Sequence, residues 1–254
     1  MQQYMLKVIE VRNISKFYGN NKVIDGLEFD VNENDIFGIV GPDGSGKTTI
    51  LRLIAGIIDL DSGDILVNGF STKREIEKVR SFIGYMPQKF SLYEDLSVEE
   101  NINFFAELYS IPLSERKTRI KELYKFSHLE NFKDKEVQYL SGGMQKKLAL
   151  TCALINFPKI LILDEPTIGV DPLSRQELWE MLKTLNKDKG ITIVVTTNYM
   201  DEVTKFDKVA LIYKGKFLIN DKPNKILQKG ITFEDIFIEK CQEYHAYENG
   251  SRIF

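Results

Sequence analysis

The segment Gly41-Pro42-Asp43-Gly44-Ser45-Gly46-Lys47-Thr48 combines glycines, a lysine and a hydroxyl at the spacing G-x-x-x-x-G-K-S/T. Glycines in such a loop let backbone N–H groups wrap the phosphates of a nucleotide, with the positive end of the next helix behind them. Lys47 would reach the β and γ phosphates, and Thr48 would offer its hydroxyl to Mg²⁺. An ordinary glycine turn would also fit in isolation. The residues expected to bind the nucleotide here are Gly41, Asp43, Gly44, Ser45, Gly46, Lys47, Thr48 and Thr49.

A second reactive group is the pair Asp164 and Glu165, directly after the apolar run Ile160-Leu161-Ile162-Leu163. Open α/β sheets bind ligands at the carboxyl ends of their strands. Asp164 suits a magnesium ion, directly or through water, and Glu165 could polarise the attacking water as general base. Taken alone, such a pair is more often a helix cap or a solvated turn. Beside a nucleotide loop the catalytic interpretation is favoured, because nucleotide hydrolysis needs both groups.

These side chains need strands and helices to position them. Residues 36–40 are an apolar run, which indicates a strand buried on both faces. Apolar residues then recur at helical spacing over 47–57, so a strand, a glycine-rich loop and a helix follow one another. Strands at 160–163 and 192–196 around a helix at 172–185 repeat this alternation. The pattern predicts an α/β fold with a parallel sheet.

The other segments predict a β-rich start and a helical insertion. Apolar residues alternate between 23 and 31, which is typical of short strands. From 88 to 158 the pattern is helical, with a capping box at Ser97-Val98-Glu99-Glu100 and a second helix at 114–125. We interpret this stretch as an inserted helical lobe. A further helix is expected near 233–243.

Composition excludes several classes of protein. A hydrophobic content of 43% argues against disorder, and 34 Lys and Arg against 37 Asp and Glu leave no global basic field for nucleic acid or lipid. The two cysteines, Cys152 and Cys241, and the two histidines indicate neither a disulfide framework nor a zinc site. No leader and no membrane-spanning run is recognisable. Any membrane contact is therefore expected to come through a partner.

A third motif, Leu140-Ser141-Gly142-Gly143-Met144-Gln145, precedes another helical stretch. With it, the chain resembles the ATP-binding-cassette (ABC) ATPases over almost its whole length. The family's signature usually reads L-S-G-G-Q, and here Met144 takes the Gln place. The phosphate-facing Ser141 and Gly143 are intact, so the resemblance implies that Ser141, Gly142 and Gly143 bind nucleotide. A plain helix N-cap would explain Ser141 almost as well in isolation.

The expected position of Ser141 has a consequence for assembly. About 15 residues of helix after it would span ~22 Å at 1.5 Å per residue. Ser141 is therefore not expected to reach the phosphates held by Lys47 of its own chain. A helix N-terminus with two glycines is nevertheless an anion site, so its simplest use is to close over ATP bound by a second subunit. The resemblance implies the same arrangement, a head-to-tail dimer with two ATP molecules between the phosphate loops and the signatures.

The resemblance also implies roles for residues outside these motifs. Tyr18, in K-F-Y-G, matches the aromatic that stacks on adenine, although a structural tyrosine at a turn fits nearly as well. Gln88, in Y-M-P-Q, matches the glutamine that senses Mg²⁺ and links the nucleotide to the helical lobe. Asp171, in G-V-D-P, matches the loop that crosses the dimer interface. Phe90 and Tyr93 lie where the family docks its membrane partner, although such aromatics are more often lobe core.

One position departs from the family pattern. Where the family has a histidine that contacts the γ-phosphate, this chain has Asn198, and neither His128 nor His245 is close in sequence. Asparagine is shorter and uncharged, so we expect a loss of about 1–3 kcal/mol, or roughly 5- to 150-fold in rate. A slowed or partner-dependent site is the resulting hypothesis. The alternative is a harmless substitution in a fully active enzyme.

Together these features predict a P-loop NTPase core with a mixed or parallel sheet, an N-terminal antiparallel β subdomain and an inserted helical lobe. The expected single ABC ATPase domain divides into a nucleotide-binding core at 1–87 and 159–230, the helical lobe with the signature at 88–158, and a C-terminal helix at 231–254. The residues expected in catalysis are Glu165, Lys47, Gln88 and Asn198, and those expected at Mg²⁺ are Thr48, Gln88 and Asp164.

The resemblance is strongest to the bacterial multidrug and antibiotic exporter branch. It implies a subunit that hydrolyses ATP with Mg²⁺ to energise export of drugs, lipids or other hydrophobic compounds. Its partners would be transmembrane subunits on separate chains and a second ABC ATPase, like or unlike, at the cytoplasmic face of the membrane as a peripheral protein. No nucleic acid partner is expected. Two alternatives remain: a weakly hydrolysing or non-hydrolysing ATP clamp beside an active subunit, and a soluble ABC ATPase that acts on ribosomes or DNA.

Overall fold

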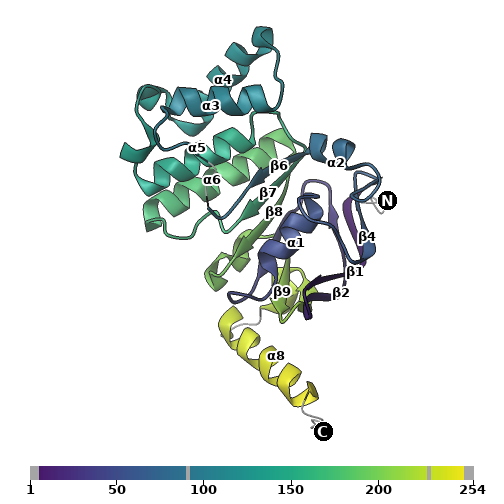
Figure 1. Cartoon of the computed structure of the whole chain (residues 1–254). Coiled ribbons are helices and arrows are strands. Elements are labelled where there is room, and N and C mark those ends of the chain that lie inside the picture. The colour runs from purple at the N-terminus through teal and green to yellow at the C-terminus, as the bar shows by residue number, and fades with distance from the viewer. Residues whose placement is uncertain (1–5, 90–91, 228–229, 249–254) are drawn as a thin grey trace, which may run out of the picture.

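A computed structural model describes residues 6–89, 92–227 and 230–248 of the chain (Figure 1). The strands are β1 (Lys7–Tyr18), β2 (Asn21–Asn32), β3 (Ile36–Val40), β4 (Ser62–Val67), β5 (Phe70–Ser71), β6 (Ile83–Met86), β7 (Ile160–Asp164), β8 (Thr192–Thr197), β9 (Lys208–Tyr213) and β10 (Lys216–Asp221). The helices are α1 (Lys47–Ile54), α2 (Ile76–Phe82), α3 (Val98–Leu108), α4 (Leu113–Ser127), α5 (Gly142–Ala153), α6 (Pro172–Lys189), α7 (Pro223–Ile226) and α8 (Phe233–Glu248), with 3-10 helices η1 (Glu130–Phe132), η2 (Val137–Tyr139) and η3 (Met200–Lys205).

The central sheet positions the candidate site. Over the described residues its strand order is β10-β9-β3-β8-β7-β6, and all neighbours are parallel except β9 and β10. Strands β3, β7 and β8 are buried at every residue, as an apolar run predicts for a strand covered on both faces. Because these strands run parallel, their carboxyl ends meet at one edge of the sheet. The expected α/β fold is confirmed.

Alternate residues of the central strands belong to two different cores. Leu161 and Leu163 of β7 pack into the core that includes α3, α4, α5 and α6. Ile160 and Ile162 point the other way, into the core shared with α1 and the second sheet. This alternation is the side-chain period of a strand, and it makes the sheet the middle layer of the molecule. In Figure 1, α5 and α6 lie on one side of the strands and α1 on the other.

The second sheet is antiparallel, with the order β2-β1-β4-β5 over the described residues. It matches the antiparallel β subdomain that the sequence predicts. The sequence pattern did not resolve α2 and β6, which lie between this sheet and the helical segment. Strand β6 has only four residues, one of them Gly84, where an added Cβ would lie 2.3 Å from the Ala153 carbonyl oxygen. A glycine required by such a close approach weakens the apolar signal of a short strand.

Helix boundaries differ from the sequence predictions for local reasons. Helix α1 ends at Ile54, before the expected residue 57, because Gly56 adopts a left-handed backbone with φ of +60°. Helix α6 continues to Lys189, four residues beyond the predicted end, and is terminated by the C-cap Gly190, which is also left-handed. The capping box at Ser97 and Glu100 forms at the start of α3 as expected. Helix α5 is 12 residues long, shorter than the expected 15 or so.

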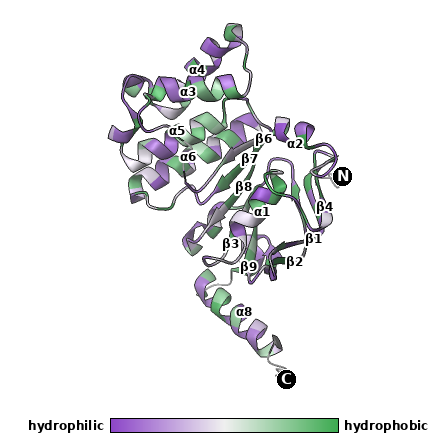
Figure 2. Cartoon of the chain, in the orientation of Figure 1, coloured by the Kyte–Doolittle hydropathy of each residue, from purple (hydrophilic) through white to green (hydrophobic). Residues whose placement is uncertain are grey.

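The helices differ in how much apolar surface they carry. Figure 2 shows α5 hydrophobic along much of its length, whereas α4 is largely hydrophilic. Most of α5 is buried, since it lies between the sheet and the neighbouring helices. Helix α8 extends away from the body of the molecule and is anchored by Phe233 and Ile236, which are buried (Figure 1). Among the described residues, no helix combines the length and apolar character needed to cross a membrane.

Candidate active site

The glycine-rich loop joins β3 to α1 at the carboxyl edge of the central sheet. Gly46 is the N-cap of α1 with φ of +110°, a conformation that side-chain-bearing residues rarely adopt. Gly41 is required by space, because an added Cβ would lie 2.3 Å from the Ile212 carbonyl oxygen. The loop is further held by the turn after β9, where the Gly215 N–H donates to the Ser45 carbonyl at 3.0 Å. Neighbouring backbone therefore holds the loop in a narrow range of conformations.

The ammonium of Lys47 lies among three oxygen atoms. It donates to the backbone carbonyls of Gly41 and Pro42 at 2.9 and 3.0 Å, and it pairs with Glu165 Oε1 at 3.1 Å. Both charged side chains are about 95% buried, at 4% and 5% exposure. A buried pair of this kind is stabilised only while both charges are present. The loop lysine and the second acidic residue, distant in sequence, are thus direct partners.

Asp164 connects the loop helix to two neighbouring strands. Its Oδ1 accepts hydrogen bonds from Thr48 at 3.1 Å and from Thr196 at 2.8 Å. The Thr196 hydroxyl also accepts from the Glu165 N–H at 3.0 Å. The parallel register places Asp164 opposite Thr196, so this network follows from the alignment of β7 with β8. The carboxylate is thereby fixed beside the hydroxyl of Thr48.

Glu165 is held by both its backbone and its side chain. Its backbone has a positive φ of 49°, which is uncommon for a residue other than glycine. Its Oε2 accepts a hydrogen bond from Gln88 at 2.7 Å, while its Oε1 faces Lys47. Its carbonyl accepts from Lys146 at 3.5 Å. Strained backbone that its surroundings hold in place is a recurring property of functional sites.

Lys146 brings a second buried ammonium to this region. It lies in α5, and only 5% of the residue is exposed. Burial lowers the pKa of Lys146 from 10.5 to about 8, although the charges of Glu165 and Asp164 favour its protonated form. The site therefore combines two lysines and two carboxylates, each at most 5% exposed.

Asn198 reaches the glycine-rich loop from the end of β8. Its Nδ2 donates to Asp43 Oδ1 at 2.8 Å, across 155 positions of sequence. Its Oδ1 is buried and has no hydrogen-bond partner among the described residues. The structure thus brings Lys47, Thr48, Gln88, Asp164, Glu165 and Asn198 together at one edge of the sheet.

The signature residues lie at the start of α5. Ser141 is the N-cap of the helix, and its hydroxyl accepts from the Met144 N–H at 3.3 Å. Ser141 and Gly142 are exposed, whereas Gly143 is buried against α6. An added Cβ on Gly143 would lie 2.3 Å from Ser174 Oγ. The helix therefore presents its N-terminal N–H groups outward, away from the buried side of its first turn.

Comparison with known proteins identifies the family. The model of the ABC transporter family matches residues 24–168 of this chain. The chain belongs to the ABC transporter family. The resemblance seen in the sequence motifs is therefore confirmed.

Individual relatives of this ABC chain carry transport-related names. It is 41% identical over 223 residues to the probable multidrug ABC transporter ATP-binding protein YbhF of Escherichia coli strain K12. This match covers 87% of this chain and 38% of YbhF. It is 38% identical over 231 residues to the Nod factor export ATP-binding protein I of Sinorhizobium fredii, covering 91% and 67%. The chain thus spans less than half the length of YbhF.

A solved structure supports the fold of the ABC chain. The dimeric ATP-binding cassette MJ0796, in a post-hydrolysis state with ADP and Pi, superposes with a TM-score of 0.77 at 28% identity. The match covers 84% of this chain and 98% of the cassette.

The other expected site residues of the ABC chain lie on other elements. Tyr18 ends β1, and its ring is about half exposed. Asp171 caps α6 by accepting from the Ser174 N–H at 3.0 Å, and hydrogen bonds from Ser174 hold its pKa below the ordinary value of 3.8. Tyr93 is partly exposed and packs edge-on against Phe104. Phe90 lies outside the described residues.

Sequence reasoning missed two contributors to the site of this ABC chain. The apolar pattern assigns Thr196 only to a strand, although the pair Thr196-Thr197 directly after the apolar residues 193–195 is a usable signal. Lys146 gave no such signal, because a lysine in a helix is normally solvated.

The donor set of the ABC chain also bears on metal binding. Within the described ranges no group of three or more His, Cys, Asp or Glu could hold a metal ion. The available pair, the Thr48 hydroxyl and the Asp164 carboxylate, fits Mg²⁺, which takes one or two protein ligands and completes its shell with water and phosphate oxygens.

Proposed function

We propose that this chain binds and hydrolyses ATP to power a membrane exporter of drugs, lipids or other hydrophobic compounds. The observation that carries the proposal is the buried group formed by Lys47, Glu165 and Gln88, directly beside Thr48 and Asp164. It unites a phosphate-binding cation, a general base and a magnesium ligand at the mouth of a phosphate loop. The names of the relatives, multidrug and Nod factor export among them, support the exporter assignment.

The ion pair between Lys47 and Glu165 gives the binding step a chemical consequence. When triphosphate enters the loop, its negative oxygens compete with Glu165 for the Lys47 ammonium. Glu165 then keeps its hydrogen bond from Gln88 and has a free oxygen to accept a proton from the attacking water. ATP binding therefore releases the base that hydrolysis needs. Mg²⁺, held by Thr48 and Asp164 and sensed by Gln88, would neutralise charge on the β and γ phosphates.

Dimerisation supplies the remaining anion contacts in this proposal. Ser141 and Gly142 stand exposed at the N-terminus of α5, where N–H groups and the helix dipole favour a phosphate. The 12-residue helix spans ~18 Å. We therefore assign Ser141, Gly142 and Gly143 to the ATP of a second cassette, like or unlike. The dimeric state of the MJ0796 structure is consistent with this assignment.

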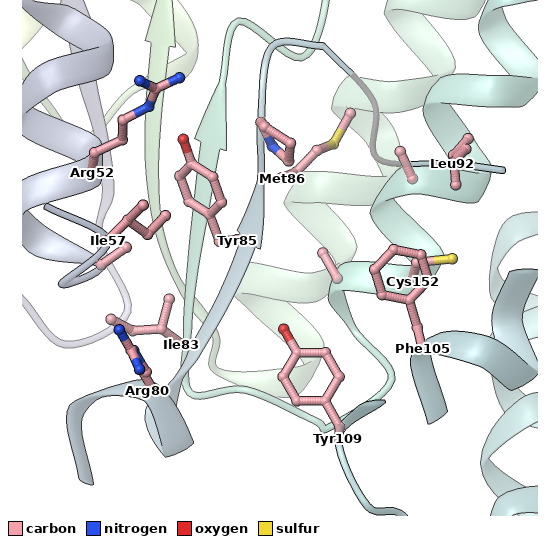
Figure 3. Close-up of a pocket in the computed structure, with 14 residues that line it drawn as sticks. Arg52, Ile57, Arg80, Ile83, Tyr85, Met86, Leu92, Phe105, Tyr109 and Cys152 are labelled. Atoms are coloured by element: carbon pink, nitrogen blue, oxygen red, sulfur yellow. The ribbon is translucent and has the colours of Figure 1, made fainter. Parts of the chain in front are cut away.

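A groove beside Gln88 is our candidate for the contact with a transmembrane subunit (Figure 3). It has a volume of about 450 Å³ and an apolar floor that includes Met86, Phe105 and Cys152, while two arginines, Arg52 and Arg80, lie at its edge. An amphipathic helix with a carboxylate directed at these arginines would satisfy both features. This docking would place the chain at the cytoplasmic face of the membrane as a peripheral subunit.

Docking predicts a charge-dependent membrane association. Arg80→Glu should lower the share of the chain that sediments with membranes of its source cells, while Arg74→Glu, whose arginine pairs with Asp64 elsewhere, should not. Equal loss in both variants would show a general charge effect instead.

The second candidate function is a weakly hydrolysing ATP clamp, which the Asn198 position favours. Its amide is engaged with Asp43 and carries no positive charge to offer a γ-phosphate. Asn198→His should raise hydrolysis by roughly 5- to 150-fold if the asparagine limits the rate. An unchanged rate would remove this explanation.

The deciding experiment is Mg-ATP hydrolysis by the purified chain at increasing protein concentration. Glu165→Gln serves as the blank, and Glu180→Gln, a surface change on α6, as the matched control. A rate that rises faster than linearly with concentration would support a self-assembling, active cassette. ATP binding with turnover no better than the blank would contradict hydrolysis by the chain alone and favour the clamp.

A further inference from the structure

Arg175 makes several contacts with the segment that follows Asn198. Its Nη2 donates to both carboxylate oxygens of Asp201 at 2.7 Å, and its Nε donates to Glu202 Oε1 at 2.8 Å. Its guanidinium also lies over the Tyr199 ring, 4.3 Å from the centroid. One side chain on α6 thus contacts three of the four residues that follow Asn198.

The carboxylate of Glu202 needs these contacts because it is buried. Glu202 is fully buried, and its Oε1 also accepts from the Trp179 Nε1 at 2.8 Å. Its Oε2 has no hydrogen-bond partner within the described part of the chain. A buried carboxylate requires a nearby compensating charge, and Arg175 supplies one at hydrogen-bonding distance. The η3 segment is therefore bound to α6 through an ion pair with a buried carboxylate. Removing the arginine would leave that carboxylate buried without a compensating charge.

The first turn of α6 also touches the signature helix. The Ser174 N–H donates to the carboxylate of Asp171, the N-cap of α6, and the Ser174 side chain fills the space that Gly143 leaves open. Arg175 is the next residue. The start of α6 therefore contacts the signature on one side and the segment after Asn198 on the other.

We propose that Arg175 is a positioning residue that sets Asn198 against the phosphate loop and ties this setting to the position of the α6 N-terminus. The inference rests on the proposed function, because it takes Asn198 to face the γ-phosphate. Asn198 is one residue from Tyr199, whose N–H donates to Thr197 Oγ1 at 3.0 Å, so the stacked ring limits how far the Asn198 backbone can move. A closing partner that presses on the Asp171 loop would shift Arg175, and with it Asn198.

The geometry requires arginine rather than any cation. A guanidinium can hold two carboxylates through separate N–H groups while its flat face stacks on an aromatic ring. A lysine at this position would keep the charge but could not hold both carboxylates and stack on the Tyr199 ring at the same time. Arg175→Lys therefore separates positioning from simple charge compensation and leaves Glu202 near a cation.

The test is a double-mutant cycle of Arg175→Lys and Asn198→Ala. The matched control is Arg116→Lys, which changes an arginine on α4 that pairs with Glu107 far from the site. We expect each single variant to lower kcat/KM for ATP by about 5- to 30-fold and the double variant to fall no more than about twofold below the worse single. Multiplying effects would overturn the proposal, as would an Arg175→Lys variant that behaves like Arg116→Lys.

Binding provides a readout that does not depend on turnover. Calorimetric Kd values for ATP and ADP give the ATP preference of each variant, and both single variants should reduce that preference by the same factor without adding. If the wild type shows no turnover above Glu165→Gln, the proposal that this chain hydrolyses ATP alone is refuted. The cycle of binding constants still decides the role of Arg175. Additive losses of the preference, or no loss in Arg175→Lys, would refute the role.

Folding is checked in parallel. The emission of Trp179, the single tryptophan of the chain, reports directly on the Glu202 contact. Should Arg175→Lys fail to fold, Asp201→Asn removes one partner at a side chain that is 69% exposed. It should lower the ATP preference by about two- to fivefold and not add to Asn198→Ala. Additive loss in that variant would count against the proposal.

Discussion

The buried lysine of α5 should make stability depend on pH in a measurable way. Burial lowers the pKa of Lys146 from 10.5 to about 8. Because one pKa unit corresponds to about 1.4 kcal/mol, holding this charge in the folded chain costs roughly 3 kcal/mol below pH 8. Between pH 8 and 10.5 the unfolded chain binds more protons than the folded chain at this side chain, so the stability of the wild type rises with pH over this window.

Lys146→Met isolates this cost, because methionine keeps an unbranched apolar stem and removes the charge. The variant gives up one hydrogen bond to the Glu165 carbonyl, which is worth about 1 kcal/mol. At pH 7 we therefore expect the variant to be more stable than the wild type by about 2 kcal/mol. At pH 10 the folded wild-type lysine is mostly neutral but the unfolded one is still mostly protonated, so a remaining cost of about 1 kcal/mol offsets the lost hydrogen bond and the two chains should be about equally stable.

Urea unfolding followed by far-UV circular dichroism measures this difference at several pH values between 7 and 10. The solutions should contain EDTA and no nucleotide, and equal m-values would show that the unfolded states are comparable. Lys147→Met is the control for loss of one positive charge in the same helix, since the Lys147 ammonium pairs with Glu177 at 2.6 Å nearer the surface. A difference between wild type and Lys146→Met that stays flat over this range would refute the reasoning, as would one that favours the variant more at higher pH.

Two further substitutions probe the packing around the site. Gly38→Ala would place a Cβ 2.2 Å from the ring of Phe206, so it should destabilise the chain by about 1–3 kcal/mol, and Phe206→Leu in the same chain should recover part of the loss in urea unfolding. Asn101→Ala removes a buried amide that donates to the Tyr93 carbonyl at 3.0 Å and accepts from the Tyr93 N–H at 2.9 Å. We expect the free energy of unfolding to fall by about 2–4 kcal/mol and proteolysis near Tyr93 to become faster. Asn103→Ala, which loses a single bond near the surface, should cost under about 1 kcal/mol; equal losses at both positions would contradict the account.

The parts of the fold predictable from sequence are those with a local cause. Strand β3 matches its prediction residue for residue, because a run of five buried positions between turn signals has few other solutions. The capping box of α3 was equally readable, since both of its partners lie within four residues. The end of α1 was misplaced because a glycine inside a helical pattern does not reveal its own φ angle.

Contacts between distant segments could not be derived in the same way. Asp164 meets Thr196 only because β7 and β8 align in one register, and Glu202 meets Arg175 only because η3 packs on α6. No spacing within either segment encodes these pairs. The α/β fold and the ABC family are confirmed, whereas the roles of Tyr18, Gln88 and Asn198 stay predictions that the proposed assays can test.

The neighbours of strand β3 determine when the phosphate loop can first exist during synthesis. Val40, the last residue of that strand, pairs with Thr197 and Leu211, both from the second half of the chain. At about 5–20 residues per second, roughly 10–30 s of translation separate the loop from its second neighbouring strand. A nascent chain stalled within the helical segment should therefore carry the complete G-x-x-x-x-G-K-T sequence without binding ATP. During that interval the side of α1 that packs against β7 and β8 has no strand to cover it, so it stays exposed to a chaperone.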